Sequence, residues 1–577
     1  MNTIYGINGP VVTVKGTKDF AMQEMVYVGN DRMVGEVIEI GIDKTTIQVY
    51  EITTGLALGE PVYTSGAPMS VTLGPGLLSN IFDGIGRPLT EIRNKSGAFI
   101  SKGSMLDSID MQKKWDVKFT VHLGDELAGG NIFADCNETP SIVHRAMLSP
   151  NTNGTVTSIM PDGLYSADEK LIELTDTKGN IHEIKLMQKW AIRKPRPIKH
   201  RMASNVPLIT GQRIVDTMFP IAKGGAAAIP GGFGTGKTMT QHQLAKWCDA
   251  DIIVYIGCGE RGNEMTQALY EFGELIDPRT GRKLTDRTVL IANTSNMPVS
   301  AREASIYTGI TIAEYYRDMG YNIALMADST SRWAEALREI SGRLEEMPAE
   351  EGFPAYLPSR LSQFYERAGC VETLAGKTGS ITIIGAVSPQ GSDFSEPVTQ
   401  NTKRYTRCFW TLDKALAYAR HYPAINWITS YSEYDRDLSG WFEENVDPNF
   451  MKCREKIMAI LREENTLMEI VKLIGADVLP DEQRLVIDIA KIIRVGFLQQ
   501  NAFHKEDTYV PLPKQFRMME IILHLYEKAQ QLLPPSIPVR LIAESGLYEK
   551  VIKMKYETSF DGYMQDIDDT INGILKR

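Results

Sequence analysis

Short stretches in which apolar and polar residues alternate fill the first 70 positions, as in residues 46–50. Glycines separate these stretches, at Gly29, Gly41, Gly55 and Gly59. Short alternating strands divided by regular turns are typical of a small β-barrel, which we predict over residues 1–70. Glycine- and proline-rich segments at 73–76 and 82–88 then indicate a boundary.

A second β-rich block follows, with strand-like segments at 117–121, 154–159 and 170–174. It lies between two blocks of different character, so we predict an inserted β-rich bulge subdomain over residues 111–195. The block ends in a basic, proline-containing stretch composed of Arg193, Lys194, Pro195, Arg196, Pro197, Lys199 and Arg201. We interpret that stretch as a solvated linker.

From about residue 200 the pattern changes to apolar runs of strand length separated by helical stretches, at 252–256, 289–292, 323–327 and 381–384. Such runs predict a mostly parallel sheet covered by helices, hence an α/β core over 71–110 and 196–435. The remainder, 436–577, has helical periodicity and predicts a C-terminal helical bundle. Its clearest helix begins at Pro480–Asp481 and has one buried face, made of Leu485, Val486, Ile489, Ile492 and Ile493.

Composition narrows the class of protein. The 577 residues are 43% hydrophobic and 23% charged, which is ordinary for a folded, multidomain protein. A net charge of -10 gives no overall attraction to nucleic acid or anionic lipid. The chain shows no leader pattern and no apolar run long enough to span a membrane, so we expect a cytosolic protein. Six scattered cysteines form no C-x-x-C pair and are interpreted as reduced packing residues.

The most informative motif fits G-x-x-x-x-G-K-T and consists of Gly231, Gly232, Phe233, Gly234, Thr235, Gly236, Lys237 and Thr238. An apolar run precedes it and a helix-compatible stretch, 239–247, follows it. Glycines let backbone N–H groups turn inward around phosphates, Lys237 can reach β- and γ-oxygens, and the Thr238 hydroxyl can ligate Mg²⁺. A chance match is the alternative, but the flanking strand and helix favour binding and hydrolysis of a nucleoside triphosphate.

Two acidic residues extend this hypothesis. Asp328 ends a strand of the same α/β block and could coordinate Mg²⁺ through water, although an aspartate at a strand end is more often a helix cap. Glu260 follows another strand, where a carboxylate could orient or deprotonate the attacking water. An ion pair with a nearby arginine such as Arg261 explains Glu260 equally well.

Three segments, 257–266, 292–298 and 327–339, resemble the catalytic A subunit of V-type (vacuolar and archaeal-type) rotary ATPases, and the resemblance extends over nearly the whole chain. It implies that Lys237 and Thr238 bind phosphate and Mg²⁺ and that Glu260 is the catalytic carboxylate. It also implies that Arg261 and Arg332 support the γ-phosphate region. Tyr422 and Phe503 match the aromatic positions that flank adenine, although core packing would be the simpler explanation of either ring without the resemblance.

The resemblance implies further expectations about assembly. ATP or ADP with Mg²⁺ would bind where the chain meets a B subunit, in an alternating hexamer of three A and three B subunits, with one arginine supplied by the neighbour. Central-stalk (D/F-type) and peripheral-stalk (E/G-type) subunits would be further partners. The complex would lie on the cytoplasmic face of a membrane, reached only through other subunits, and would couple ATP hydrolysis or synthesis to proton or sodium transport.

Three residues depart from the family pattern. Gly232 stands where proline or alanine is common, and Thr235 replaces the cysteine of eukaryotic relatives, which indicates a bacterial or archaeal source and removes disulfide control. Ser392 replaces a usual glycine. Two other functions share the phosphate-binding motif: a different hexameric P-loop motor, such as a nucleic-acid translocase or a secretion ATPase, and a non-catalytic nucleotide-binding ring subunit. The acidic net charge disfavours the translocase. A non-catalytic subunit is disfavoured by the joint presence of Lys237, Thr238, Glu260 and Asp328.

Overall fold

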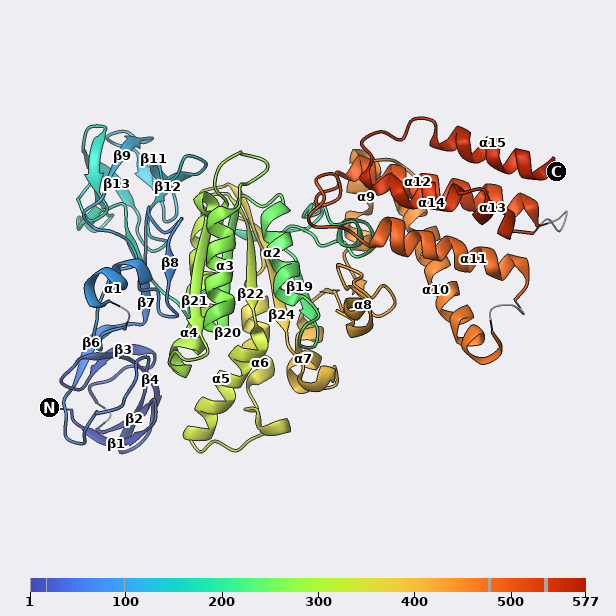
Figure 1. Cartoon of the computed structure of the whole chain (residues 1–577). Coiled ribbons are helices and arrows are strands. Elements are labelled where there is room, and N and C mark those ends of the chain that lie inside the picture. Colours follow the sequence, from blue (N-terminus) through green and yellow to red (C-terminus); the bar gives the residue numbers. More distant parts are fainter. Residues whose placement is uncertain (1, 17, 98, 476–478, 534–537, 577) are drawn as a thin grey trace. The chain divides into compact units, whose positions relative to one another are not determined.

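The computed structural model describes residues 2–576, except 17, 98, 476–478 and 534–537 (Figure 1). The chain forms two compact units. Unit 1 comprises Met1–Ala203, Gly224–Ala226 and Ala250–Thr406, and unit 2 comprises Ser204–Lys223, Ala227–Asp249 and Arg407–Arg577. Both units draw on distant parts of the sequence, so neither coincides with a single continuous block of the chain.

Unit 1 begins with an antiparallel sheet of six strands in the order β1-β2-β5-β4-β3-β6. The strands are β1 Ile4–Asn8, β2 Val11–Lys15, β3 Glu24–Val28, β4 Met33–Ile40, β5 Lys44–Val49 and β6 Val62–Pro68. A bridge between Thr3 and Pro61 joins the first strand to the last, so the sheet closes into a barrel. Aliphatic residues such as Val12, Val26 and Ile47 fill its interior, as the alternating pattern predicts.

The inserted block contains two four-stranded antiparallel sheets, in the orders β12-β11-β9-β14 and β10-β13-β15-β16. Their strands are β9 Lys114–Phe119, β10 Glu126–Leu127, β11 Ile132–Asn137, β12 Val143–Met147, β13 Gly154–Ile159, β14 Gly163–Ser166, β15 Ile172–Thr175 and β16 Ile181–Ile184. The strand that follows the inserted block, β17 (Gln188–Ala191), pairs with β7 (Ser70–Leu73), a strand that comes before the block in the sequence. The inserted block therefore lies within unit 1, between two strands that pair with each other.

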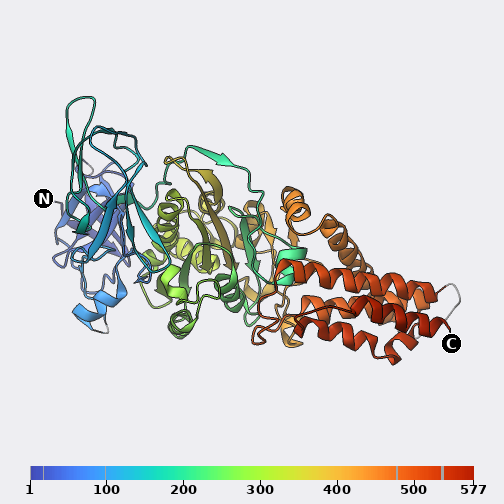
Figure 2. The same cartoon turned by 90° about the horizontal axis from the view of Figure 1, so that it is seen from above.

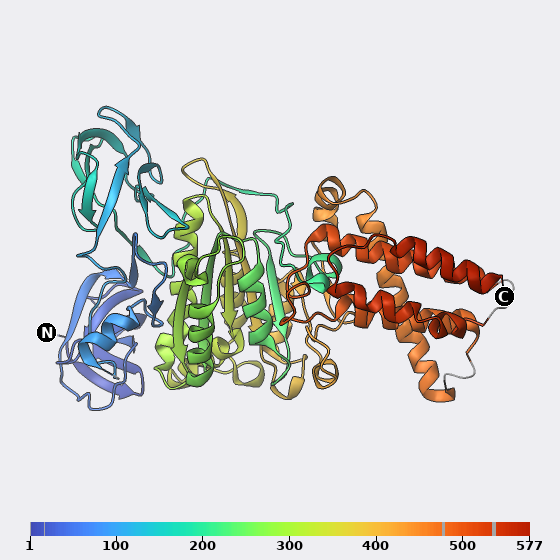
Figure 3. The same ribbon diagram turned by 45° about the horizontal axis from the view of Figure 1, so that its top comes forward.

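The α/β part of unit 1 contains the four strands predicted from apolar runs. Parallel pairing gives the order β24-β22-β20-β21-β8, and β23 is antiparallel to β24 at one side and also pairs with β18. These strands are β8 Ile81–Phe82, β18 His200–Met202, β20 Ile252–Glu260, β21 Thr288–Thr294, β22 Asn322–Asp328, β23 Gly369–Glu372 and β24 Thr378–Val387. Figure 3 shows helices lying alongside this sheet.

The helices of unit 1 are α1 Leu89–Ser96, α3 Gly262–Glu274, α4 Val299–Asp318, α5 Thr330–Arg343, α6 Leu357–Tyr365 and α7 Pro397–Tyr405. Almost every residue of α4 is buried. The reason is that α4 packs against β20, β21 and β22 and also against α5. The carboxyl ends of the parallel strands, including Glu260 and Asp328, therefore lie at one edge of a rigid layer.

Unit 2 combines a short parallel pair of strands with a helical bundle. Strand β19 (Ala226–Pro230) pairs with β25 (Cys408–Phe409), which pairs in turn with β26 (Tyr431–Ser432). The helices are α2 Lys237–Trp247, α8 Lys414–Tyr418, α9 Asp435–Asn445, α10 Phe450–Ile474, α11 Asp481–Ile492, α12 Leu512–Ala529, α13 Arg540–Glu544, α14 Leu547–Lys553 and α15 Tyr563–Leu575. Figure 2 shows the long C-terminal helices side by side, in agreement with the contacts of α12 with α10, α11 and α15.

The helix predicted from Pro480–Asp481 onward is present as α11 and continues as a π-helical segment, Ile493–Leu498. A second π-helical segment, Ile214–Met218, is fully buried. None of the six cysteines, all of which the structure describes, forms a disulfide, and four of them are buried. Across the described residues, no helix is both long and apolar enough to cross a bilayer.

Candidate functional site

The glycine-rich loop 231–238 of unit 2 joins β19 to α2, as its motif predicts. Gly234 and Gly236 have φ values of 78° and 90°, a left-handed conformation that glycine adopts without steric cost. Gly231 is required for a different reason, because a Cβ there would lie 2.6 Å from the Thr235 hydroxyl oxygen. The loop thus places the start of α2, with its positive end of the helix dipole, at Lys237.

Lys237 folds back over its own loop. Its Nζ donates to the carbonyl oxygens of Gly231 and Gly232 at 2.8 and 3.0 Å. The buried Thr235 hydroxyl donates to the Gly232 carbonyl at 2.8 Å, which ties the loop across its middle. An anion held by the loop would offer the Lys237 ammonium a charged acceptor, which forms a stronger bond than a neutral carbonyl.

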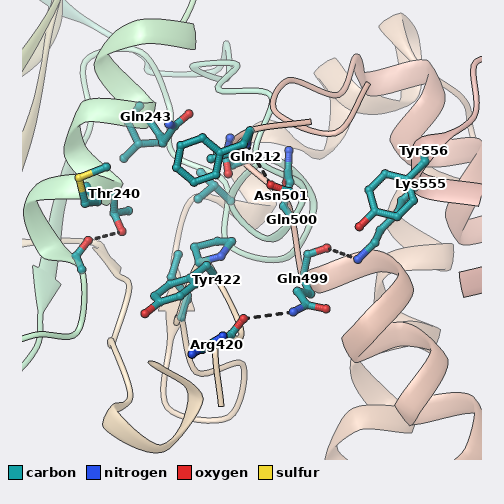
Figure 4. Close-up of a pocket in the computed structure, with 18 of the residues that line it drawn as sticks. Gln212, Thr240, Gln243, Arg420, Tyr422, Gln499, Gln500, Asn501, Lys555 and Tyr556 are labelled. Atoms are coloured by element: carbon teal, nitrogen blue, oxygen red, sulfur yellow. Dashed lines mark hydrogen bonds between the residues drawn. The ribbon is translucent and has the colours of Figure 1, made fainter. Parts of the chain in front are cut away.

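A cavity of about 600 Å³ in unit 2 adjoins this loop (Figure 4). Gly234 and Gly236 line it from the loop, and both predicted aromatic residues, Tyr422 and Phe503, line it from two other segments. Phe503 is 95% exposed and Tyr422 is 45% exposed, so neither ring is packed into the core of the chain. The cavity has the size of a small-molecule site, with aromatic walls and several amide side chains.

Residues that the sequence pattern did not single out hold the wall of this cavity in place. Arg213, whose side chain is 0% exposed, pairs with Asp507 at 2.6 Å and donates to the carbonyl of Gln499 at 2.8 Å. The Asp507 carboxylate also accepts from the backbone N–H of Asn501 at 2.6 Å. Burial lowers the pKa of Arg213 despite the carboxylate beside it. Segment 497–507, which carries Phe503, is therefore fixed by a buried ion pair.

Two residues between α14 and α15 also line this cavity. Lys555 and Tyr556 line it, and Lys555 Nζ donates to the carbonyls of Val495 at 2.7 Å and Gln499 at 3.3 Å (Figure 4). The Tyr556 ring contacts that of His504 with centroids 4.4 Å apart. No short motif around 555 marks these residues, because their role depends on contacts with segments far away in the sequence.

In unit 1, Glu260 and Asp328 end two adjacent parallel strands. Gly257 of β20 is in register with Asp328 of β22, which places Glu260 just beyond that level. Asp328 is 2% exposed and accepts a hydrogen bond from the Tyr255 hydroxyl at 3.0 Å. Both carboxylates therefore belong to the edge at which ligands of parallel α/β sheets bind.

Burial, followed by the neighbouring carboxylate of Asp328, raises the pKa of Glu260 above its ordinary range. A hydrogen bond with Glu264 acts in the same direction, whereas the Arg332 guanidinium opposes it. Carboxyl groups with a raised pKa are frequent among active-site acids.

The arginines of this edge differ in their surroundings. Arg332 is half-exposed, and its guanidinium pairs with Glu335 at 2.8 Å. Arg261 is exposed at the start of α3. Arg302, which the sequence did not indicate, approaches the backbone beside Glu260, because a Cβ on Gly259 would lie 2.9 Å from its Cδ. The Cβ of Arg332 would be nearer still, at 2.8 Å, so arginines of α4 and α5 both approach the backbone beside Glu260.

Oxygen donors for a magnesium ion are present in both units, as the Thr238 hydroxyl and the Asp328 carboxylate. Hard oxygen ligands are what Mg²⁺ prefers, and it commonly keeps several waters and takes one or two carboxylates together with substrate phosphates. Among the described residues, no group of three or more His, Cys, Asp or Glu side chains forms a preassembled metal cage. Each of these oxygens, taken by itself, is of the type that Mg²⁺ accepts.

Four family models match the chain in order. They are the beta-barrel domain of the ATP synthase alpha/beta family at 4–66, the alpha/beta subunit barrel-sandwich domain at 106–193, the alpha/beta family nucleotide-binding domain at 211–432, and the C-terminal domain of V and A type ATP synthase at 439–541. The V-type ATP synthase alpha chain of Halothermothrix orenii is 60% identical over 95% of this chain and 93% of its own length.

The chain belongs to the alpha (A) subunits of V/A-type ATP synthases. The alpha chain 2 of Clostridium tetani is also 60% identical, over 96% of this chain and 94% of its own length. The corresponding chain of the A-type ATP synthase of Methanopyrus kandleri is 54% identical over 96% and 94%. The family resemblance and the prokaryotic source predicted from the sequence are confirmed. The chain is a catalytic, ATP-binding component of a multisubunit enzyme that hydrolyses or synthesises ATP.

Among solved structures, the ATPase EscN of the enteropathogenic E. coli type III secretion system aligns with a TM-score of 0.64, covering 91% of this chain and all of EscN. At 21% identity the likeness concerns the fold alone. Between a secretion ATPase and the ATP synthase family, the 60% identical relatives decide for the ATP synthase family.

One sequence interpretation holds only in part. Most of the basic stretch 193–201 is exposed, as a solvated linker would be, but Arg196 is 3% exposed and Arg193 is nearly enclosed. Arg193 pairs with Glu36 of the barrel and with Glu303 of α4, both at 2.8 Å. Charge and proline content suggested solvent exposure, but carboxylates from distant segments neutralise the guanidinium groups inside unit 1.

Proposed function

We propose that ATP or ADP binds with its phosphates on residues 231–238 and its adenine in the cavity lined by Tyr422 and Phe503. The observation that carries this proposal is that the loop glycines and both aromatic residues line one cavity in unit 2. In this arrangement the backbone N–H groups and Lys237 bind phosphate oxygens, and the aromatic rings stack on the base. The domain boundaries proposed from the sequence, 1–70, 71–110 with 196–435, 111–195 and 436–577, place this cavity in the core and helical domains.

Mg²⁺ is the proposed cofactor, held by the Thr238 hydroxyl and, through water, by Asp328. When bound, it neutralises charge on the β- and γ-phosphates. The Tyr255 hydroxyl, which donates to Asp328, holds that carboxylate in place. Support for this assignment comes from the oxygen donors themselves and from the family of the chain.

Glu260 is proposed to orient the attacking water and accept its proton, with Arg261 and Arg332 supporting the γ-phosphate region. To accept a proton the carboxyl group must first be ionised, although burial and Asp328 raise its pKa. Cations close to Glu260 lower that pKa, as Arg332 already does. A cation held by Asp328 would lower the pKa of Glu260 further and so favour the ionised carboxylate that accepts the proton.

The proposed assembly is an alternating hexamer of three A and three B subunits, with a B-subunit arginine completing each site. D/F-type central-stalk and E/G-type peripheral-stalk subunits are further proposed partners. The complex would lie on the cytoplasmic face of a membrane and couple ATP turnover to proton or sodium transport. An arginine supplied by a neighbour raises phosphoryl-transfer rates by about 10³ to 10⁵ in comparable enzymes.

The decisive experiment compares ATP binding and turnover for the purified chain and for the hexamer reconstituted with a B subunit. We expect the chain alone to bind nucleotide but to turn over poorly. In the hexamer, Glu260→Gln should retain ATP binding and lose most turnover, whereas Glu274→Gln, at an exposed position of α3, should change neither. Equal turnover by the chain alone would refute the shared site, and full activity of Glu260→Gln would remove Glu260 from its role.

A further inference from the structure

A cavity of about 610 Å³ in unit 1 is lined by six arginines, from the basic stretch 193–201, from α4 and α6, and from the turn after α6. They are Arg193, Arg196, Arg201, Arg317, Arg360 and Arg367. Nothing in the nucleotide chemistry proposed above uses this cavity. Whether this cavity can bind an anion depends on how many of the six guanidinium groups are not already paired with a carboxylate.

Four of the six arginines are committed to carboxylates. Arg193 pairs with Glu36 and Glu303, Arg196 and Arg317 with Asp318, and Arg367 with Glu314, each at 2.6–2.8 Å. These pairs join the barrel, the basic stretch and α4. Their guanidinium groups therefore have a structural role, and they form the wall of the cavity.

Arg201 and Arg360 are different. Arg201 donates only to backbone carbonyls, those of Ala368 and Glu366. Arg360 lies over the ring of Tyr356, 5.7 Å from its centroid. Within the part of the chain that the structure describes, neither guanidinium has a carboxylate at ion-pair distance, so two positive charges of the lining lack a counter-charge.

A buried hydroxyl adds a second, independent observation. Tyr307 of α4 is 4% exposed and lines the cavity, yet its hydroxyl has no hydrogen-bond partner among the described residues. Burial and Glu303 raise the pKa of Tyr307, whereas Arg193, Arg360 and Arg367 lower it, which places three guanidinium groups near that hydroxyl. Buried polar groups are nearly always satisfied in native proteins, so this O–H is available to donate to an acceptor from outside the chain.

Two glutamates also line the cavity, and neither cancels these charges. Glu314 is held by Arg367 through bonds of 2.9 and 2.7 Å. Glu366 is exposed and accepts a hydrogen bond from the Ser362 hydroxyl at 2.6 Å. A ligand at Tyr307 would therefore meet donors from several directions: one hydroxyl and the free N–H groups of Arg360 and Arg201.

We propose that this cavity binds a phosphate-type oxyanion, with Tyr307, Arg360 and Arg201 as its donors. A tetrahedral dianion offers acceptor oxygens in several directions, which suits converging guanidinium and hydroxyl donors better than a planar carboxylate does. The oxyanion is either free inorganic phosphate or the phosphate group of a small metabolite. Its binding would neutralise the two unpaired guanidinium charges at the junction of the barrel, the basic stretch and α4.

The test uses the full-length chain carrying Lys237→Ala, so that the glycine-rich loop no longer competes for phosphate. Inorganic phosphate is titrated calorimetrically, and we expect saturable binding of one phosphate per chain. Arg360→Ala in the same background should weaken the affinity at least tenfold. Arg282→Ala, which removes an exposed arginine outside the cavity, is the matched control and should leave the affinity unchanged.

Tyr307→Phe separates binding from folding. Because its hydroxyl has no partner in the described part of the chain, the variant should unfold at the same or a higher temperature than its parent when phosphate is absent. We expect it to bind phosphate several-fold more weakly and to lose most of the phosphate-induced rise in unfolding temperature. Equal affinity of the parent, Tyr307→Phe and Arg360→Ala, or non-saturable binding throughout, would overturn the proposal.

A parallel titration with glycerol phosphate distinguishes the two sources. Binding of inorganic phosphate alone would identify the free ion as the ligand. Tighter binding of the ester, with the same dependence on Arg360, would identify a phosphorylated metabolite. If neither anion binds the Lys237→Ala chain while ATP binding by the unmodified chain is intact, the oxyanion site is refuted and the nucleotide site is unaffected.

Discussion

Replacing Asp507 with asparagine tests whether the buried ion pair holds the wall of the nucleotide cavity. The Arg213 and Asp507 side chains are both 0% exposed and 2.6 Å apart. Asparagine keeps the shape of the side chain but removes its charge. The Arg213 guanidinium would then be buried with carbonyl partners only, at Phe497 and Gln499.

The expected cost of this substitution follows from the burial of the Arg213 guanidinium. Burial already lowers the pKa of Arg213 with Asp507 in place, so desolvation of the guanidinium outweighs its attraction to the carboxylate. Removing one partner of a buried pair typically costs about 3–5 kcal/mol, because the remaining charge is uncompensated. About 1.4 kcal/mol corresponds to a tenfold change in an equilibrium constant. If the segment that carries Phe503 must be ordered for nucleotide to bind, we expect affinity to fall at least tenfold.

Two measurements check this expectation. Amide hydrogen exchange should become faster in residues 497–507, and binding of a fluorescent ATP analogue should weaken, while exchange in unit 1 stays the same. Asp569→Asn, at an exposed position of α15, is the matched control. Unchanged exchange and affinity in Asp507→Asn would show that the ion pair does not order the cavity wall.

Three further predictions concern other parts of the chain. Because the pKa of Glu260 is raised, the folded chain keeps this proton to higher pH than the unfolded chain does. The free energy of unfolding therefore falls as pH rises between the two pKa values. In thermal unfolding, Glu260→Gln should be more stable than the parent at about pH 9 but not at about pH 4. Lys555→Met removes the hydrogen bonds of Lys555 to the Val495 and Gln499 carbonyls. It should raise KM for ATP several-fold with little change in kcat, and Lys555→Arg should restore part of the loss. An unchanged KM would argue against this role. Ser392 has a φ of 64°, and its buried hydroxyl has no partner among the described residues. Because glycine adopts this backbone conformation without steric cost, Ser392→Gly should raise the free energy of unfolding by about 1 kcal/mol. A lower unfolding temperature of the variant would contradict this explanation.

Local sequence patterns predicted the elements that carry the site. The four apolar runs became the parallel strands β20, β21, β22 and β24, because continuous burial on both faces leaves a direct signature in the sequence. The loop 231–238 could be recognised because its glycines are required by the backbone itself, at Gly234 and Gly236. The family resemblance predicts that Tyr422 and Phe503 flank adenine. The structure adds that both residues line one cavity, which no local pattern indicates.

The sequence by itself therefore determined the order of domains, the phosphate loop and the family of the chain, since each of these depends on residues close together along the chain. Only the tertiary structure decided which charged residues are buried. Arg213 and Asp507 are 294 positions apart, and Arg193 and Glu36 are 157 apart, so no local pattern could pair them. A guanidinium group that is fully buried is almost always paired with a carboxylate brought there by folding, and sequence periodicity carries no information about that encounter.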